Sequence, residues 1–113
     1  MKGLKHAIIN LAFDNLDALY AAYMPFVVNG GLFVETRRLP RLGDEVFAVV
    51  SLPEDPEKYP VSGKVVWITP QGASGPRKTG FGIRLSPDHA DLVSKIERLL
   101  AGRLNAERPT LTL

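Results

Sequence analysis

The chain has 113 residues, an apolar content of 45% and a charged content of 23%, which are typical of one globular domain and argue against disorder. Its formal net charge of +2 is too small to indicate nucleic-acid binding, which needs basic residues gathered on one face. The sequence contains no cysteine, which excludes disulfides and thiolate metal sites and is typical of a reducing compartment.

The N-terminal region predicts a strand rather than a targeting segment. Two lysines precede a short apolar run, but Asn10 and Asp14 interrupt it and no convincing cleavage site follows. No run approaches the roughly 18 consecutive apolar residues of a membrane span. We therefore expect a cytoplasmic protein without direct membrane insertion, whose first strand lies within residues 5–13.

Residues 14–24 indicate one or two helical turns. Asp14 and Asn15 are candidate N-caps, and alanines and leucines follow them. We expect the helix to stop before Pro25, because the residue that precedes a proline avoids the helical region.

Four segments rich in β-branched and aromatic residues predict strands: residues 32–36, 45–52, 61–69 and 80–85. Segments rich in glycine and proline separate them, such as residues 42–44, 53–56 and 70–76. Several short strands in succession favour an antiparallel barrel or sandwich.

The last element predicted is an amphipathic helix of about four turns that packs on the sheet. Ser86 is the candidate N-cap, and Pro87 follows it at the first helical position. Gly102 is the candidate C-cap. The apolar stripe of this helix consists of Val93, Ile96, Leu99 and Leu100. We expect one domain over residues 1–102, followed by a tail at 103–113 whose last four residues alternate weakly.

The residues that carry catalysis or bind metals are few. His6 and His89 are far apart, and neither has a second ligand at metal-binding spacing, so surface or capping roles are favoured. The sequence has no Gly-x-Ser-x-Gly elbow and no phosphate loop. We expect no enzyme, no cofactor and no metal; a small hydrolase is the least favoured class, for want of a nucleophile and base pair.

The most unusual segment is the uncharged stretch from Tyr20 to Val34, which places three aromatic residues and a proline before the Gly30-Gly31 turn. So much aromatic surface beside a connection indicates either core packing or a partner. Trp67 leaves the same choice open, because strand alternation groups it with a mixed set of neighbours.

Four motifs follow one another in the order found in PilZ domains. They are GGLFV at 30–34, LGDEV at 42–46, GKVVW at 63–67 and GFGIRL at 80–85. The chain resembles this family over roughly residues 5–100. The resemblance implies a six-stranded antiparallel β-barrel followed by one amphipathic α-helix.

Many PilZ domains bind cyclic di-GMP through Arg-x-x-x-Arg before the barrel and Asp/Asn-x-Ser-x-x-Gly on it. Aligning the motif glycine with Gly31 places Phe26 at the Asp/Asn position and Val28 at the Ser position. No arginine precedes Gly31, and the Arg37-Arg-Leu-Pro-Arg41 run lies after the turn. The resemblance therefore implies that cyclic di-GMP is not bound.

The run from Leu19 to Phe26 is similar to that of the single-domain branch of the family, which acts in type IV pilus assembly. This similarity implies a non-enzymatic adaptor that is required for pilus assembly and twitching motility. The implied partners are the pilus assembly ATPase and a degenerate GGDEF–EAL protein. The candidate partner-binding residues are Tyr20, Tyr23, Phe26 and Trp67.

Two alternatives stay open. Tyr23 and Phe26 can instead seal the barrel. We expect Tyr20 at the edge of its helical stripe, mostly exposed, because Leu16, Leu19 and Tyr23 can pack on the barrel together.

The second alternative concerns the function: a divergent cyclic di-GMP receptor that binds phosphate through a set of basic residues. That set consists of Arg37, Arg38, Arg41, Arg77 and Lys78.

Overall fold

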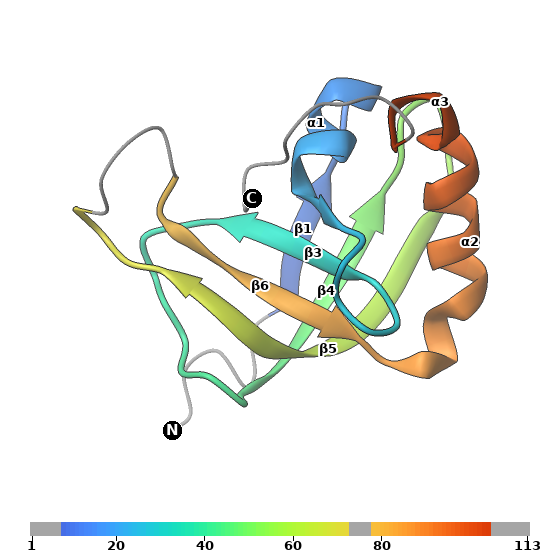
Figure 1. The fold of residues 1–113 in the computed structure, drawn as a ribbon. Coiled ribbons are helices and arrows are strands. Elements are labelled where there is room, and N and C mark those ends of the chain that lie inside the picture. Colours follow the sequence, from blue (N-terminus) through green and yellow to red (C-terminus); the bar gives the residue numbers. More distant parts are fainter. Residues whose placement is uncertain (1–7, 73–77, 105–113) are drawn as a thin grey trace.

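The computed structural model describes residues 8–72 and 78–104. One six-stranded sheet forms the body of the described chain, and two longer helices pack against it (Figure 1). The elements in chain order are β1 (Ile8–Ala12), α1 (Leu16–Ala22), β2 (Tyr23–Met24), β3 (Gly31–Glu35), β4 (Glu45–Ser51), β5 (Lys58–Thr69), β6 (Gly80–Leu85), the 3-10 turn η2 (Pro87–His89), α2 (Ala90–Leu99) and α3 (Ala101–Leu104).

The strand order is β1-β4-β5-β6-β3-β2, and the sheet is mixed. β1 runs parallel to β4, whereas all other neighbours are antiparallel. The expected antiparallel β-barrel is therefore wrong in two respects, because the sheet is neither purely antiparallel nor closed. Short turns make consecutive strands antiparallel, but β1 and β4 are not consecutive, so the order of the strands in the sequence leaves their relative direction open.

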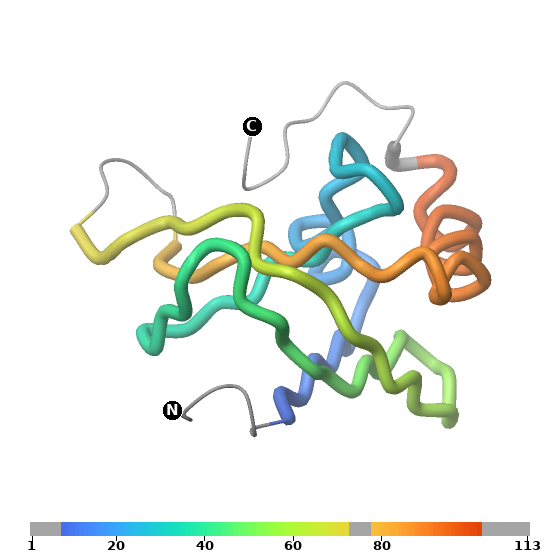
Figure 2. Tube along the Cα trace, turned by 90° about the horizontal axis from the view of Figure 1, so that it is seen from below, coloured from blue at the N-terminus to red at the C-terminus, as the bar shows by residue number. Residues whose placement is uncertain are grey.

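The sheet bends on itself, so that β3 and β6 lie across from β1 and β4 (Figures 1 and 2). A register shift between Val65 and Trp67 helps the long strand β5 to bend. Closure fails at β2, which has two residues and pairs only with Gly31 and Leu32. The remainder of β3 consequently has no strand partner on the side that faces β1 within the described chain.

Most of the local predictions are confirmed. The predicted strands correspond to β1, β3, β4, β5 and β6, and α1 follows Asn15, whose side chain accepts a hydrogen bond from the Ala18 amide at 2.8 Å. α1 ends at Ala22, earlier than predicted, because the next two residues pair with β3. β5 begins before the predicted segment and includes Pro60. The proline is tolerated because β6 pairs with β5 only from Gly63 onward.

The C-terminal helix is confirmed, but its buried stripe and its end differ from the prediction. Ser86 caps the 3-10 turn by accepting a hydrogen bond from the Asp88 amide at 3.2 Å. Leu92, Ile96 and Leu100, spaced four residues apart, are the buried residues, whereas Leu99 is 38% exposed. Gly102 is not a C-cap, because it lies inside α3.

The core lies between the curved sheet and the helices. Its fully buried side chains include Leu19, Leu32, Val46, Val50, Phe81, Ile83, Leu85, Ile96 and Leu100. No helix within residues 8–72 and 78–104 is long and apolar enough to span a membrane. His6, Arg77 and tail residues 105–113 lie outside the described residues.

Candidate functional site

The connection between α1 and β3 forms a tight turn that α2 supports. The Val27 amide donates to the Met24 carbonyl at 3.2 Å, and the Gly30 amide donates to the Val27 carbonyl at 2.8 Å. Asn29 and Gly30 both have positive φ, 67° and 85°, which asparagine and glycine tolerate best. A Cβ on Gly30 would lie 3.0 Å from a methyl group of Val93, so the turn sits directly on α2.

Tyr23 is a core residue at the base of this turn. It is 1% exposed, and its hydroxyl donates a hydrogen bond to Glu97 Oε2 at 2.5 Å. Burial, and then the hydrogen bond and charge of Glu97, raise the pKa of Tyr23 far above its usual value. Of the two readings of Tyr23, the structure supports packing against the sheet and α2.

Tyr20 is also buried, at 7% exposure, so the expectation that it lies mostly exposed at the edge of its stripe is wrong. The helical geometry explains the difference. At about 100° per residue, Tyr20 lies only about 40° around the helix axis from Leu16, whereas Leu19 lies about 60° away on the other side. Tyr20 is therefore as central in the buried stripe as Leu19 is.

Phe26 and Val28 are the exposed residues of the turn. Phe26 is 47% exposed and Val28 is 70% exposed, while Val27 between them packs against the core. The turn therefore presents two apolar side chains on a backbone fixed by hydrogen bonds. A role of Phe26 in binding a partner stays a prediction.

Trp67 lies close to the same segment. Met24 Sδ and Trp67 Cβ lie 2.8 and 3.2 Å from the point that a Cβ on Gly82 would occupy. Trp67 packs against the core but is not fully buried, and its indole N–H donates to Thr69 Oγ1 at 2.9 Å. The tertiary structure thus brings Trp67 close to Met24 of β2, although 43 positions separate the two residues in the sequence.

The basic residues proposed as an alternative phosphate grip are only partly assembled. Arg37 and Lys78 line one cavity of about 450 Å³, and Arg38 lines a neighbouring cavity of about 340 Å³. Glu35 lines both cavities and lies 3.9 Å from Lys78 Nζ, which weakens the attraction for an anion. Arg41 lies in the β3–β4 connection, where its amide donates to Asp44 Oδ2 at 3.0 Å.

His89 has a structural role. Its Nε2 accepts a hydrogen bond from the Ser62 amide at 3.0 Å and so ties the 3-10 turn to β5. In the described part of the chain, no three His, Cys, Asp or Glu side chains are grouped so that they could hold a metal ion.

Sequence reasoning missed a polar cluster that attaches α2 to the β4–β5 connection. Lys95 Nζ lies 2.9 Å from Asp55 Oδ2 and donates to the Tyr59 hydroxyl oxygen at 2.8 Å. The Tyr59 hydroxyl in turn donates to Asp55 Oδ2 at 2.6 Å. No local pattern could have revealed it, because Lys95 lies 36 positions after Tyr59.

The curved sheet, the helix packed on it and the exposed turn define a small β-rich domain. The PilZ domain model matches residues 8–102, and the chain belongs to this family. PilZ domains bind ligands or act as adaptors and are not a known catalytic family. A comparison with curated proteins found no significant match.

Proposed function

We propose that the protein is a non-enzymatic adaptor for type IV pilus assembly and twitching motility. In this proposal it binds the pilus assembly ATPase and a degenerate GGDEF–EAL protein and does not bind cyclic di-GMP. The observation that carries the proposal is the exposure of Phe26 and Val28, 47% and 70%, at the two positions that the family motif gives to polar nucleotide contacts.

The chemistry of these side chains supports a protein partner over a nucleotide. A phenyl ring and an isopropyl group offer no hydrogen bond to phosphate or to a guanine edge. They gain free energy when a partner removes their apolar surface from water, at about 25 cal/mol per Å². The turn is fixed by the Gly30 and Leu85 amides, so little conformational entropy is lost on binding.

The four candidate residues divide into two roles. Phe26 and Trp67 retain accessible surface and are the proposed contacts with a partner. Tyr20 and Tyr23 are buried, and in this proposal they support the turn from the core. In this proposal, the run from Leu19 to Phe26 resembles the pilus branch of the family for two reasons. It contains the partner contact, Phe26, and it contains the buried residues that support the turn, Tyr20 and Tyr23.

A matched pair of variants tests the contact. Phe26→Ala removes the exposed ring of the turn, and Phe47→Ala removes a ring of similar exposure, 41%, from β4. We expect Phe26→Ala to weaken binding to the purified pilus assembly ATPase by at least about 2 kcal/mol, which is typical of an interface hot spot. Phe47→Ala should bind as the wild type does. Equal affinities of all three proteins would contradict the assignment of Phe26.

The pilus role is tested in cells. A strain that lacks the gene should have no surface pili, and the wild-type gene should restore them. Normal pili in the deletion strain would exclude the proposed function. Complementation with Phe26→Ala should fail while the protein is present at wild-type abundance.

One observation favours the second candidate function, a divergent cyclic di-GMP receptor: Arg37 and Lys78 line the same cavity, where they could bind phosphate. Isothermal titration calorimetry separates the two functions. The adaptor proposal expects no heat at micromolar nucleotide. Heat that disappears in the double variant Arg37→Ala and Arg41→Ala would instead favour the receptor.

A further inference from the structure

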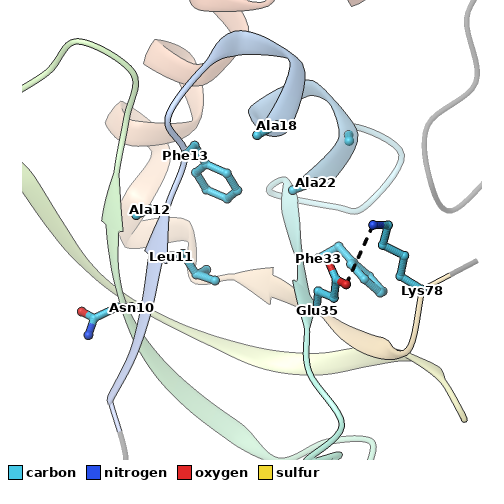
Figure 3. Close-up of a pocket in the computed structure, with 10 residues that line it drawn as sticks. Asn10, Leu11, Ala12, Phe13, Ala18, Ala22, Phe33, Glu35 and Lys78 are labelled. Atoms are coloured by element: carbon cyan, nitrogen blue, oxygen red, sulfur yellow. Dashed lines mark ion pairs between the residues drawn. The ribbon is translucent and has the colours of Figure 1, made fainter.

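The opening in the sheet leaves two strand edges facing each other across a groove. Figure 3 shows β1 and β3 on opposite sides of this groove, with α1 across one end. One cavity of about 460 Å³ lies between them below α1, and a second of about 340 Å³ continues toward Arg38. We call this groove, between β1 and residues 33–35 of β3, the seam.

The backbone at both edges is directed into the seam. The Phe13 amide donates to the Ser51 carbonyl at 2.9 Å, so Phe13 directs its amide toward β4. Successive residues of a strand direct their amides to opposite sides, and Asn10 and Ala12 therefore direct theirs away from β4. The Thr36 amide donates to Thr79 at 3.1 Å on the β6 side, which by the same alternation turns Phe33 and Glu35 toward the seam.

Within residues 8–72 and 78–104, β1 shows none of the features that normally protect an edge strand. Proteins usually protect exposed edges with lysine, proline, a bulge or a covering segment. The sequence of β1, Ile-Ile-Asn-Leu-Ala, has no charge and no proline. Among the described residues, no strand covers its free edge. Such an edge suits the addition of a strand from another chain.

The apolar lining and the charged residues of the seam determine which side chains an inserted strand can carry. Leu11, Phe13 and Phe33 line the cavity below α1, so an inserted strand meets apolar side chains on that face. Arg38 lines the cavity at the opposite end and Arg37 lines the cavity next to it, while Glu35 and its ion-pair partner Lys78 also border the cavity below α1. An acidic residue of the inserted strand is therefore favoured at that end.

We propose that the seam binds an extended segment of a partner protein, with apolar side chains at alternate positions and an acidic residue at the Arg38 end. Phe33 shares one cavity with Phe13, and Thr36 shares the other with Ile8, so β1 and β3 run in opposite directions along the seam. A strand whose first residue lies at the Arg38 end is antiparallel to β3 and parallel to β1. This surface is separate from the Phe26 turn, and the proposal does not depend on the pilus function.

The probe is the synthetic peptide Ac-Asp-Thr-Val-Thr-Val-Thr-Val-NH2, and the readout is amide hydrogen exchange of the full chain followed by NMR. On saturation with peptide we expect new protection of the Asn10, Ala12 and Glu35 amides. Leu11 should be protected before and after addition, because its amide faces β4. A peptide that binds without protecting Asn10 and Ala12 would overturn the proposal.

Two substitutions at one position separate backbone pairing from side-chain contact. Asn10→Pro removes an amide that faces the seam, whereas Asn10→Ala keeps it and removes only an exposed side chain. We expect Asn10→Pro to lose at least about tenfold in peptide affinity and Asn10→Ala to bind as the wild type does. Equal binding by both variants would contradict strand addition. Where Asn10→Pro fails to fold, the exchange pattern of the wild type still decides the question.

The charge and the occupant are tested with the same readout. Replacing the peptide's aspartate by lysine should weaken binding, and Arg38→Glu should reverse this preference. A preference of the wild type for the lysine peptide would contradict the placement of the acidic residue at the Arg38 end.

The occupant is tested without peptide. Protection of the Asn10 and Ala12 amides that is lost on dilution of the protein would assign the seam to a second copy of the chain. The same protection lost on deleting residues 105–113 would assign it to the chain's own tail. Either result would overturn the proposal of a partner strand.

Discussion

The Tyr23 hydroxyl donates a hydrogen bond to the Glu97 carboxylate at 2.5 Å across 74 positions of sequence. This bond joins the base of the exposed turn to α2, next to the place where Gly30 packs on Val93. Because Tyr23 is buried, its hydroxyl needs a hydrogen-bond partner within the protein, and Glu97 on α2 supplies the acceptor. The position of the turn therefore depends on the C-terminal helix.

Removing the Tyr23 hydroxyl should destabilise the domain without creating a large cavity, because the aromatic ring remains in the core. We expect Tyr23→Phe to lower the free energy of unfolding by about 1.5–3 kcal/mol, the usual contribution of a hydrogen bond to a charged group. Glu97→Gln keeps an acceptor and should cost less. Urea denaturation of the three proteins measures both effects, and an unchanged midpoint for Tyr23→Phe would show that the bond contributes nothing.

The same residue predicts a loss of stability at high pH. Burial raises the pKa of Tyr23 in the folded state, so the contribution of its neutral hydroxyl to stability is complete below the ordinary tyrosine pKa of 10.0 and is lost as the pH rises above it. Between pH 9 and about 11.5, the wild type should lose stability more steeply than Tyr23→Phe does. Parallel curves from thermal melts would contradict the burial of the neutral hydroxyl.

The cluster on the other side of α2 predicts a loss of stability in acid. The hydrogen bonds from Tyr59 and from Lys95 lower the pKa of Asp55 to about 2 from its ordinary value of 3.8. Its contribution is therefore present above about pH 4 and is lost as the pH falls toward 2. Melting temperatures should fall over this window in the wild type and less in Asp55→Asn. Identical acid slopes would rule out a contribution from the cluster.

Two glycines of β6 should differ in their tolerance of a methyl group. A Cβ on Gly80 would overlap the carbonyl oxygen of Val34, whereas a Cβ on Gly82 would first meet the flexible end of Met24 at 2.8 Å. Backbone cannot move aside without breaking the β3–β6 pairing. We expect Gly80→Ala to cost at least about 3 kcal/mol and Gly82→Ala only about 1 kcal/mol, as measured by denaturant unfolding.

Burial reverses the expectation for Tyr20 and distinguishes it from Phe26. Tyr20→Ala should cost about 3 kcal/mol of stability, as the truncation of a large core side chain does. Phe26→Ala should cost about 1 kcal/mol or less, because about half of its surface is already in water. Thermal denaturation compares the two variants, and a larger loss for Phe26→Ala would invalidate the division between contact and support.

The local structure of this protein follows from short stretches of its sequence. The five longer strands, the caps at Asn15 and Ser86 and the existence of the C-terminal helix depend on residues close together in the chain, and the sequence predicts them, whereas the short strand β2 was predicted as helix. The family resemblance also comes from short motifs at fixed spacings, and it is confirmed over residues 8–102. The exposure of Phe26, at 47%, did not follow from its neighbours, because the sequence left open whether this ring seals the sheet or faces a partner.

Only the tertiary structure decided what depends on distant pairings. The parallel alignment of β1 with β4 and the open edge at β3 depend on which strands meet, and alternation within a strand carries no such information. The burial of Tyr20 and Tyr23 depends on what covers α1 and on an acceptor 74 positions away. The choice between core and partner contact for an aromatic side chain is therefore made by long-range packing, because the same apolar surface satisfies both.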